Sequence, residues 1–124
     1  MLTKFSQNLQ PHIEQELTFA SQAKSKEAHH VEFQHLENAH VIGQESTYWH
    51  VKVHCLMLVW GIRNRSPKEF LGQIFRIVGA ATKTAIGLVP QGNTGGANVN
   101  PFKVLPISPT HAEIIRCAKN VSSS

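Results

Sequence analysis

The stretch ENAHVIGQESTYWHVKVH, residues 37–54, contains two pairs of polar residues at helical spacing, separated by a short connecting segment. Glu37 and His40 are three residues apart, and His50 and His54 are four apart, so each pair falls on one face of a helix. The segment between the pairs contains a glycine, which favours the end of a helix. A chain that folds back there sets His40 level with His50, and Glu37 one turn further along, near His54. The stretch therefore predicts two antiparallel helices with a carboxylate and three imidazoles between them.

The rest of the chain also has the pattern of helices. Apolar residues recur near the 3.6-residue period in the first segment, and no strand-like alternation of useful length occurs. Two of the later segments begin with a capping box. Ser66 and Glu69 form the first, with Pro67 at the first helical position, and Thr110 and Glu113 form the second. We expect helices over about 10–24, 27–42, 47–62, 66–86 and 110–119.

These elements predict an all-α fold. Four main helices with short connections are expected to be antiparallel neighbours, either as a bundle or as tetratricopeptide-like stacked hairpins. A long loop rich in Gly, Asn and Pro, residues 88–108, separates them from the short C-terminal helix. The length of 124 residues fits one domain, which we place at 1–121, with a frayed tail at 122–124.

Composition narrows the class of protein. Apolar residues make up 41% and charged residues only 16%, which argues against a disordered chain. The N-terminus lacks the pattern of a secretory signal, and no apolar run reaches the roughly 18 residues of a membrane span. We therefore expect a cytoplasmic protein that does not associate with membranes. The net charge of +4 is spread along the chain, so nucleic acid is not the expected partner. Cys55 lies in an apolar segment, and we expect a buried thiol.

The helical wheel of residues 47–62 places both of its histidines on the buried face. Lys52 and Arg63 mark the solvent side, and His50 and His54 lie opposite. A buried imidazole without hydrogen-bond partners costs about 1–3 kcal/mol. Two interpretations follow for the cluster: a metal site, or a polar network in the core. The other histidines of this region, at positions 29, 30 and 35, are interpreted as surface residues.

As a metal site, the cluster has the donors of a transition-metal protein. Glu37, His40, His50 and His54 are the predicted ligands. Four protein ligands suit tetrahedral Zn²⁺, with Ni²⁺, Co²⁺ or iron as alternatives. The wheel leaves Glu37 on the flank of its helix face, so it is the predicted fourth ligand or a partner of a ligand.

Glu69 and Arg76 are possible auxiliary residues, and a glycine-rich loop segment is a possible anion site. Glu69 is explained by its capping box, although it would also supply a second carboxylate to the site. The loop segment Gly92-Asn93-Thr94-Gly95-Gly96 offers backbone N–H groups suited to an anion, and otherwise forms a rigid turn. It lacks the lysine and the helix start of a phosphate-binding P-loop.

Several of these motifs together resemble a known family. The segments are Leu36-Glu37-x-Ala39-His40-Val41-Ile42-Gly43-Gln44, His50-x-x-x-His54-x-x-Met57-x-x-Trp60, Glu69-x-x-Gly72-Gln73-x-x-Arg76, and Gly87-x-x-Pro90-x-Gly92-Asn93-Thr94-Gly95-Gly96 with Pro106-Ile107. They resemble a small bacterial family known only as domain of unknown function 3703, over about residues 17–109. The resemblance implies a short, mainly helical protein and brings no established activity. Asn38 stands where the family pattern suggests arginine, outside the predicted ligands.

Three functions remain open at this point. The first is a small metal-binding protein, with a role in metal homeostasis or tolerance. The second is a non-enzymatic helical interaction module, which would bind a protein partner or form a homo-oligomer. The third is an enzyme acting on an anionic small molecule through Arg76, His54 and the glycine loop. Catalysis is not the expectation, because no general base can be assigned.

Overall fold

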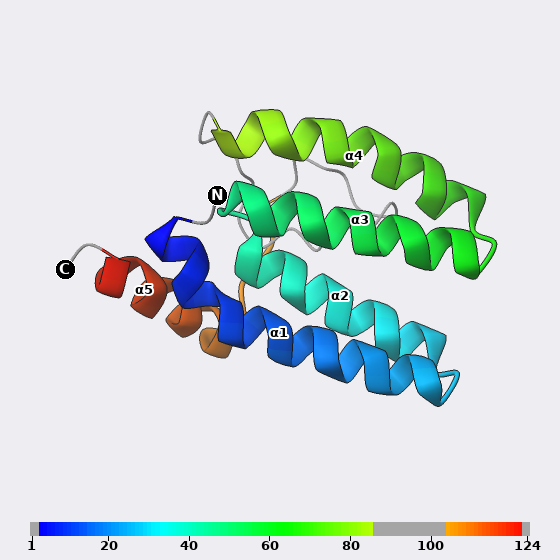
Figure 1. Ribbon diagram of the computed structural model, residues 1–124, viewed down its shortest axis with the longest axis horizontal. Coiled ribbons are helices and arrows are strands. Elements are labelled where there is room, and N and C mark those ends of the chain that lie inside the picture. The colour runs from blue at the N-terminus through cyan, green and yellow to red at the C-terminus, as the bar shows by residue number, and fades with distance from the viewer. Residues whose placement is uncertain (1–2, 86–103, 123–124) are drawn as a thin grey trace.

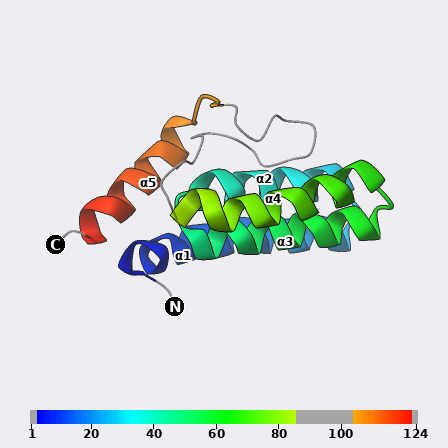
Figure 2. The same ribbon diagram turned by 90° about the horizontal axis from the view of Figure 1, so that it is seen from above.

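The computed structural model describes residues 3–85 and 104–122. Within these ranges the chain forms five helices and no strand: α1 (Lys4–Ser25), α2 (His29–Gly43), α3 (Thr47–Arg63), α4 (Pro67–Ala85) and α5 (Pro109–Ser122). Helices α1 to α4 lie side by side in chain order, each antiparallel to the next, and α5 packs beside the N-terminal part of α1 (Figures 1 and 2). The all-α prediction is confirmed. None of the described helices is both long enough and apolar enough to span a membrane.

The helix ends differ from the prediction mainly at α1. This helix begins six residues earlier than predicted and continues through Pro11, because Thr3 caps it by accepting a hydrogen bond from the Ser6 N–H at 3.1 Å. Leu9 and Ile13 are fully buried, which offsets the helix bond that the proline removes. At α5 the cap is Ser108, not Thr110, and the helix reaches Ser122.

Two hairpins, α1–α2 and α3–α4, share one turn geometry. Glu27 and Arg65 both have positive φ, at 56° and 53°. The next residue in each turn donates its N–H five residues back, from Ala28 to the Ala23 carbonyl at 2.9 Å and from Ser66 to the Gly61 carbonyl at 2.8 Å. This is the pattern of a Schellman motif with a non-glycine residue in the left-handed position. The structure therefore favours the stacked-hairpin form of the predicted fold.

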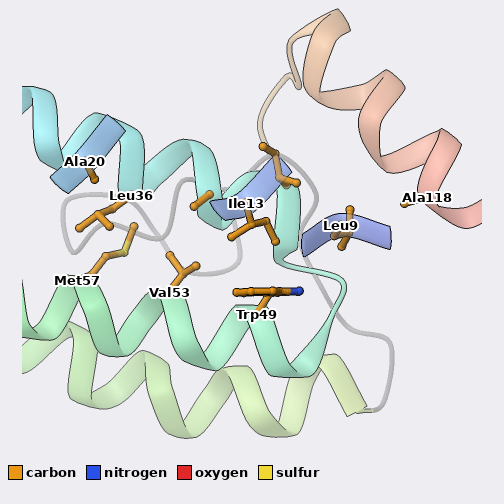
Figure 3. Close-up of a cluster of buried hydrophobic side chains, with 10 residues drawn as sticks. Leu9, Ile13, Ala20, Leu36, Trp49, Val53, Met57 and Ala118 are labelled. Carbon is orange, nitrogen blue, oxygen red and sulfur yellow. The ribbon is translucent and has the colours of Figure 1, made fainter. Parts of the chain in front are cut away.

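The hydrophobic core lies on one side of this stack. It is built from α1, α2, α3 and α5, with Leu9, Ile13, Leu36, Trp49, Val53 and Met57 among its members (Figure 3). Helix α4 adds no residue to this cluster. The described buried side chains of α4 are Glu69, Gln73, Arg76 and Ala80, three of which are polar.

The turn between α2 and α3 is tight because Gly43 allows it. A Cβ atom at this position would lie 2.7 Å from the Trp49 Cβ and 2.9 Å from the Ile13 Cδ1. The helix does end at Gly43 as predicted, but the capping residue after it is right-handed, so glycine is needed here for close packing and not for positive φ. Ser46 then caps α3 by accepting from the Trp49 N–H at 3.3 Å.

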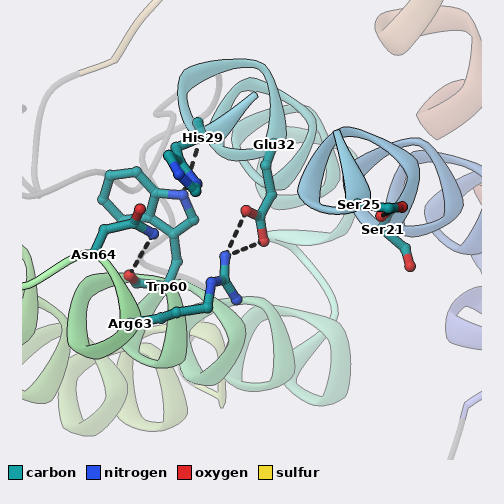
Figure 4. A network of polar contacts seen from close by, with 7 residues as sticks. All are labelled: Ser21, Ser25, His29, Glu32, Trp60, Arg63 and Asn64. Carbon is teal, nitrogen blue, oxygen red and sulfur yellow. Dashed lines mark hydrogen bonds and ion pairs between the residues drawn. The ribbon is translucent and has the colours of Figure 1, made fainter. Parts of the chain in front are cut away.

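The opposite end of the α2–α3 pair is held by polar contacts. Arg63 Nη2 lies 2.5 Å from both carboxylate oxygens of buried Glu32, and Trp60 Nε1 donates to the His29 carbonyl at 3.1 Å (Figure 4). With both ends fixed, the middle turns of the two helices are brought together in a set register. His40 lies in the last turn of α2, and His50 and His54 lie in the first two turns of α3, so all three are close to the α2–α3 turn.

Candidate metal centre

Three buried histidines meet between α2 and α3. His40, His50 and His54 are 3%, 5% and 2% exposed, and their ring centroids lie 4.6–4.9 Å apart. One nitrogen from each ring can be chosen so that all three atoms lie within 4.8 Å of one another. The predicted meeting of the three imidazoles is therefore present in the structure.

One pair of histidine nitrogens in the cluster has nearly the spacing of metal ligands. His40 Nε2 and His54 Nε2 are 3.1 Å apart. Around a tetrahedral zinc ion with Zn–N bonds of about 2.0–2.1 Å, neighbouring nitrogens lie about 3.4 Å apart. His50 offers a nitrogen within 4.8 Å of the ligand atoms chosen from His40 and His54.

A hydrogen-bonded chain from α4 fixes the tautomer of His54. Gln73 Nε2 donates to the Glu69 carboxylate, which can only accept, so Gln73 Oε1 faces the other way. That oxygen lies 2.6 Å from His54 Nδ1, which must therefore carry the proton. When the ring is uncharged, its lone pair is then on Nε2, the atom that faces His40. This arrangement, an imidazole N–H held by an acceptor behind it, is common among histidines that bind metals.

The buried side of α4 is mainly polar, with Ala80 as its apolar member. Glu69, Gln73 and Arg76 are 8%, 0% and 8% exposed and follow one another at helical spacing. Burial lowers the pKa of Arg76, and the negative charge of Glu69 partly offsets that effect. Sequence reasoning placed Gln73 only within a family motif and gave it no role. The sequence did offer a signal: Gln73 lies four residues after Glu69 and three before Arg76, and this spacing puts all three on one helix face.

The capping prediction for Glu69 accounts for its backbone but not for its side chain. Its N–H donates to Ser66 Oγ at 3.3 Å, as the motif predicts. Its carboxylate, in contrast, is buried and accepts from Gln73. Gly61 makes this burial sterically feasible: a Cβ there would lie 3.1 Å from the Phe70 nitrogen and 3.3 Å from the Glu69 Cβ. The two helices approach closely at this point, and Glu69 is carried inward.

The remaining predicted site residues lie outside this cluster or outside the described residues. Glu37 is half-buried on α2, and its oxygens do not belong to the group of ligand atoms within 4.8 Å. The glycine loop at 92–96 lies outside the described residues. His29 and His30 are exposed as predicted, and His35 is partly exposed, with its Nδ1 2.8 Å from the Glu16 carboxylate. Cys55 is exposed, so the prediction of a buried thiol was wrong, because that side of α3 faces outward.

The chemistry of the three-histidine cluster follows from its donors. When His54 presents a lone pair at Nε2, His40 can approach it at 3.1 Å only by donating a proton from its own Nε2. A cation bound by both lone pairs would replace that proton.

The family model described as "Protein of unknown function (DUF3703)" matches residues 7–115. Neither the curated proteins nor the solved structures contain a match. The match spans every residue of the cluster, and its description carries no activity.

Proposed function

The chain belongs to the DUF3703 family, and from that premise we propose that it is a transition-metal-binding protein with His40, His50 and His54 as ligands. One observation carries the proposal: three buried imidazoles meet, and the lone pair of one of them is turned into the cluster by a hydrogen bond from behind. Imidazole donors suit Zn²⁺, Ni²⁺, Co²⁺ and iron, and we propose Zn²⁺ as the preferred ion.

The surroundings of the cluster support a bound cation. Glu69 is joined to His54 through Gln73, so its negative charge lies behind a ligand. A carboxylate in that position raises the basicity of an imidazole and strengthens its bond to the metal. The buried setting also reduces competition from water for the ligand atoms.

The fourth coordination position decides what the metal can do. If Glu37 turns inward it completes a closed tetrahedral site, which fits storage, transport or tolerance of a metal. If water takes that position, the site has the open form found in catalytic zinc proteins. We propose the closed form, acting in metal homeostasis in the cytoplasm, with no catalytic role.

A second candidate function is a metal-free interaction module. The observation that favours it is the chain from His54 through Gln73 to Glu69, because such a chain can satisfy buried polar groups without an ion. In that case the cluster specifies how α3 and α4 pack, and function resides on the surface. The two candidates differ in whether the purified protein contains and needs metal.

The decisive experiment measures metal content on protein made without a histidine tag. We expect close to one transition-metal ion per chain, and Co²⁺ substitution should give the visible spectrum of a tetrahedral nitrogen-rich site. His54→Ala should abolish binding at this site. His30→Ala is the matched control, since it removes an exposed histidine from α2 and should leave the metal content unchanged.

Two results would overturn the proposal. Metal bound equally well by wild type and by a His50→Ala, His54→Ala double variant would show that the ligands lie elsewhere. A melting temperature that responds neither to chelator nor to added Zn²⁺, Ni²⁺ or Co²⁺ would favour the interaction module, because a ligand of the native state must stabilise it.

A further inference from the structure

Helix α4 has its apolar side outward. The residues turned toward the protein include Glu69, Gln73 and Arg76, all less than 10% exposed. The residues turned away are Leu71, Ile74, Phe75 and Val78, exposed by 64%, 44%, 64% and 70%. A surface helix of a monomer normally buries its apolar side and exposes its polar side. The reversal means that the outer side of α4 lacks the polar character of a surface in contact with water.

The place of α4 in the fold makes this reversal informative. Among the described helices α4 packs mainly on α3, and it is the last helix of the stack that starts with α1 (Figures 1 and 2). Stacked helical hairpins need a polar outer surface on the terminal helix to remain soluble as single chains. A contiguous apolar surface on an end helix instead marks an interface.

We propose that this surface is covered by α4 of a second copy of the chain. The four exposed residues fall at positions i, i+3, i+4 and i+7, so their spacing is symmetric about a point between Ile74 and Phe75. A two-fold axis through that point makes the helices antiparallel and sets Leu71 against Val78 of the other copy, and Ile74 against its Phe75. An isologous dimer requires such self-complementarity.

Charge also favours a second copy over other occupants. Among the side chains that the structure describes, the outer side of α4 has no charged residue between Leu71 and Val78, and the exposed cations nearest to it, Arg65 and Lys68, lie near the start of the helix. An amphipathic helix that lies on a membrane normally has basic residues along its length. An acidic partner protein would find no row of cations to pair with. An uncharged apolar surface is best covered by another like it, and its apolar side chains form the centre that an interface of about 800 Å² per partner needs.

The first test measures mass in solution across a range of concentrations by analytical ultracentrifugation. We expect a dimer for the wild-type chain and a dimer dissociation constant at least about 100-fold larger for Phe75→Lys, because a charge would be buried at the axis. Val31→Lys is the matched control: Val31 is 45% exposed on α2, and this variant should dimerise like wild type. Circular dichroism of each variant confirms that the fold is kept.

The second test checks the pairing itself. In a Cys55→Ser, Cys117→Ser background, Leu71→Cys and Val78→Cys proteins are oxidised separately and as a mixture. The mixture should form a disulfide-linked dimer in much higher yield than either protein alone, because residue 71 faces residue 78 across the axis.

Several results would overturn the proposal. They are a wild-type monomer at all concentrations, a dimer that Phe75→Lys leaves intact, and equal cross-linking of the separate and mixed proteins. Binding of the monomer to vesicles of anionic lipid, lost in Phe75→Lys, would assign the surface to membranes instead. None of these readouts depends on whether the histidine cluster binds metal.

Discussion

The Nδ1 atom of His54 on α3 lies 2.6 Å from the Oε1 atom of Gln73 on α4, and this contact sets which nitrogen of His54 faces the cluster. The glutamine is itself oriented by Glu69 one turn earlier. A glutamine of α4 thereby controls the donor atom of a histidine on α3. The helix that adds nothing to the main hydrophobic core contributes this control instead.

Gln73→Leu should weaken metal binding without removing a ligand. The variant leaves His54 without its acceptor, so the ring can rotate and change tautomer, and such partners of ligands typically account for about 10–100-fold in affinity. Competition with a chromophoric chelator would measure the change. Gln34→Leu, an exposed glutamine on α2, should bind like wild type. Equal affinity of the two variants would mean that the contact does not orient a ligand.

Metal affinity should fall as the pH drops below about 6.5, the ordinary pKa of imidazole. Each histidine must give up any proton it holds on its ligating nitrogen, so the apparent binding constant decreases by up to about tenfold per ligand per pH unit. Above that range the affinity should level off. Titrations between about pH 5 and 8 at constant ionic strength would show it. A flat profile down to about pH 5 would count against histidine ligands.

Arg65→Gly should stabilise the fold. Arg65 has φ 53°, a conformation that glycine adopts readily and other residues adopt at a cost of about 1 kcal/mol. We expect an increase in the free energy of unfolding of about 0.5–1 kcal/mol, measured by urea denaturation. Asn64→Gly is the control: its φ is −94° and its side chain donates to the Trp60 carbonyl, so this change should destabilise. A loss of stability in Arg65→Gly would show that the arginine side chain outweighs the backbone strain.

Gly43→Ala should destabilise the turn on which the site depends. The added Cβ would lie 2.7 Å from the Trp49 Cβ and 2.9 Å from the Ile13 Cδ1, both in the core. Overpacking of this kind costs about 1–3 kcal/mol, which should exceed the gain from replacing glycine in a helix. Thermal and urea unfolding would measure the loss. Ile13→Val in the same chain should recover part of it by removing one of the two contacts. An unchanged stability would mean that the helices shift apart readily.

The local signals in the sequence were sufficient for the helices and for the three histidines. Periodicity and capping residues located the five helices of the described residues, since these signals depend on residues within a few positions of one another. The i, i+4 spacing of His50 and His54, with the short connection back to His40, was enough to bring these rings together. The start of α1 was missed because burial of Leu9 and Ile13 compensates for Pro11, and that burial depends on the other helices.

The surroundings of the site needed the tertiary structure. The sequence by itself determined which residues form helices. It also determined that α2 and α3 place imidazoles on facing sides, because the spacing of residues along a helix fixes the direction in which their side chains point. Only the tertiary structure decided that α4 turns its polar side inward and its apolar side outward. The sequence of an amphipathic helix shows that one side is polar and the other apolar. It does not show which side faces the protein, because that depends on the neighbouring helices.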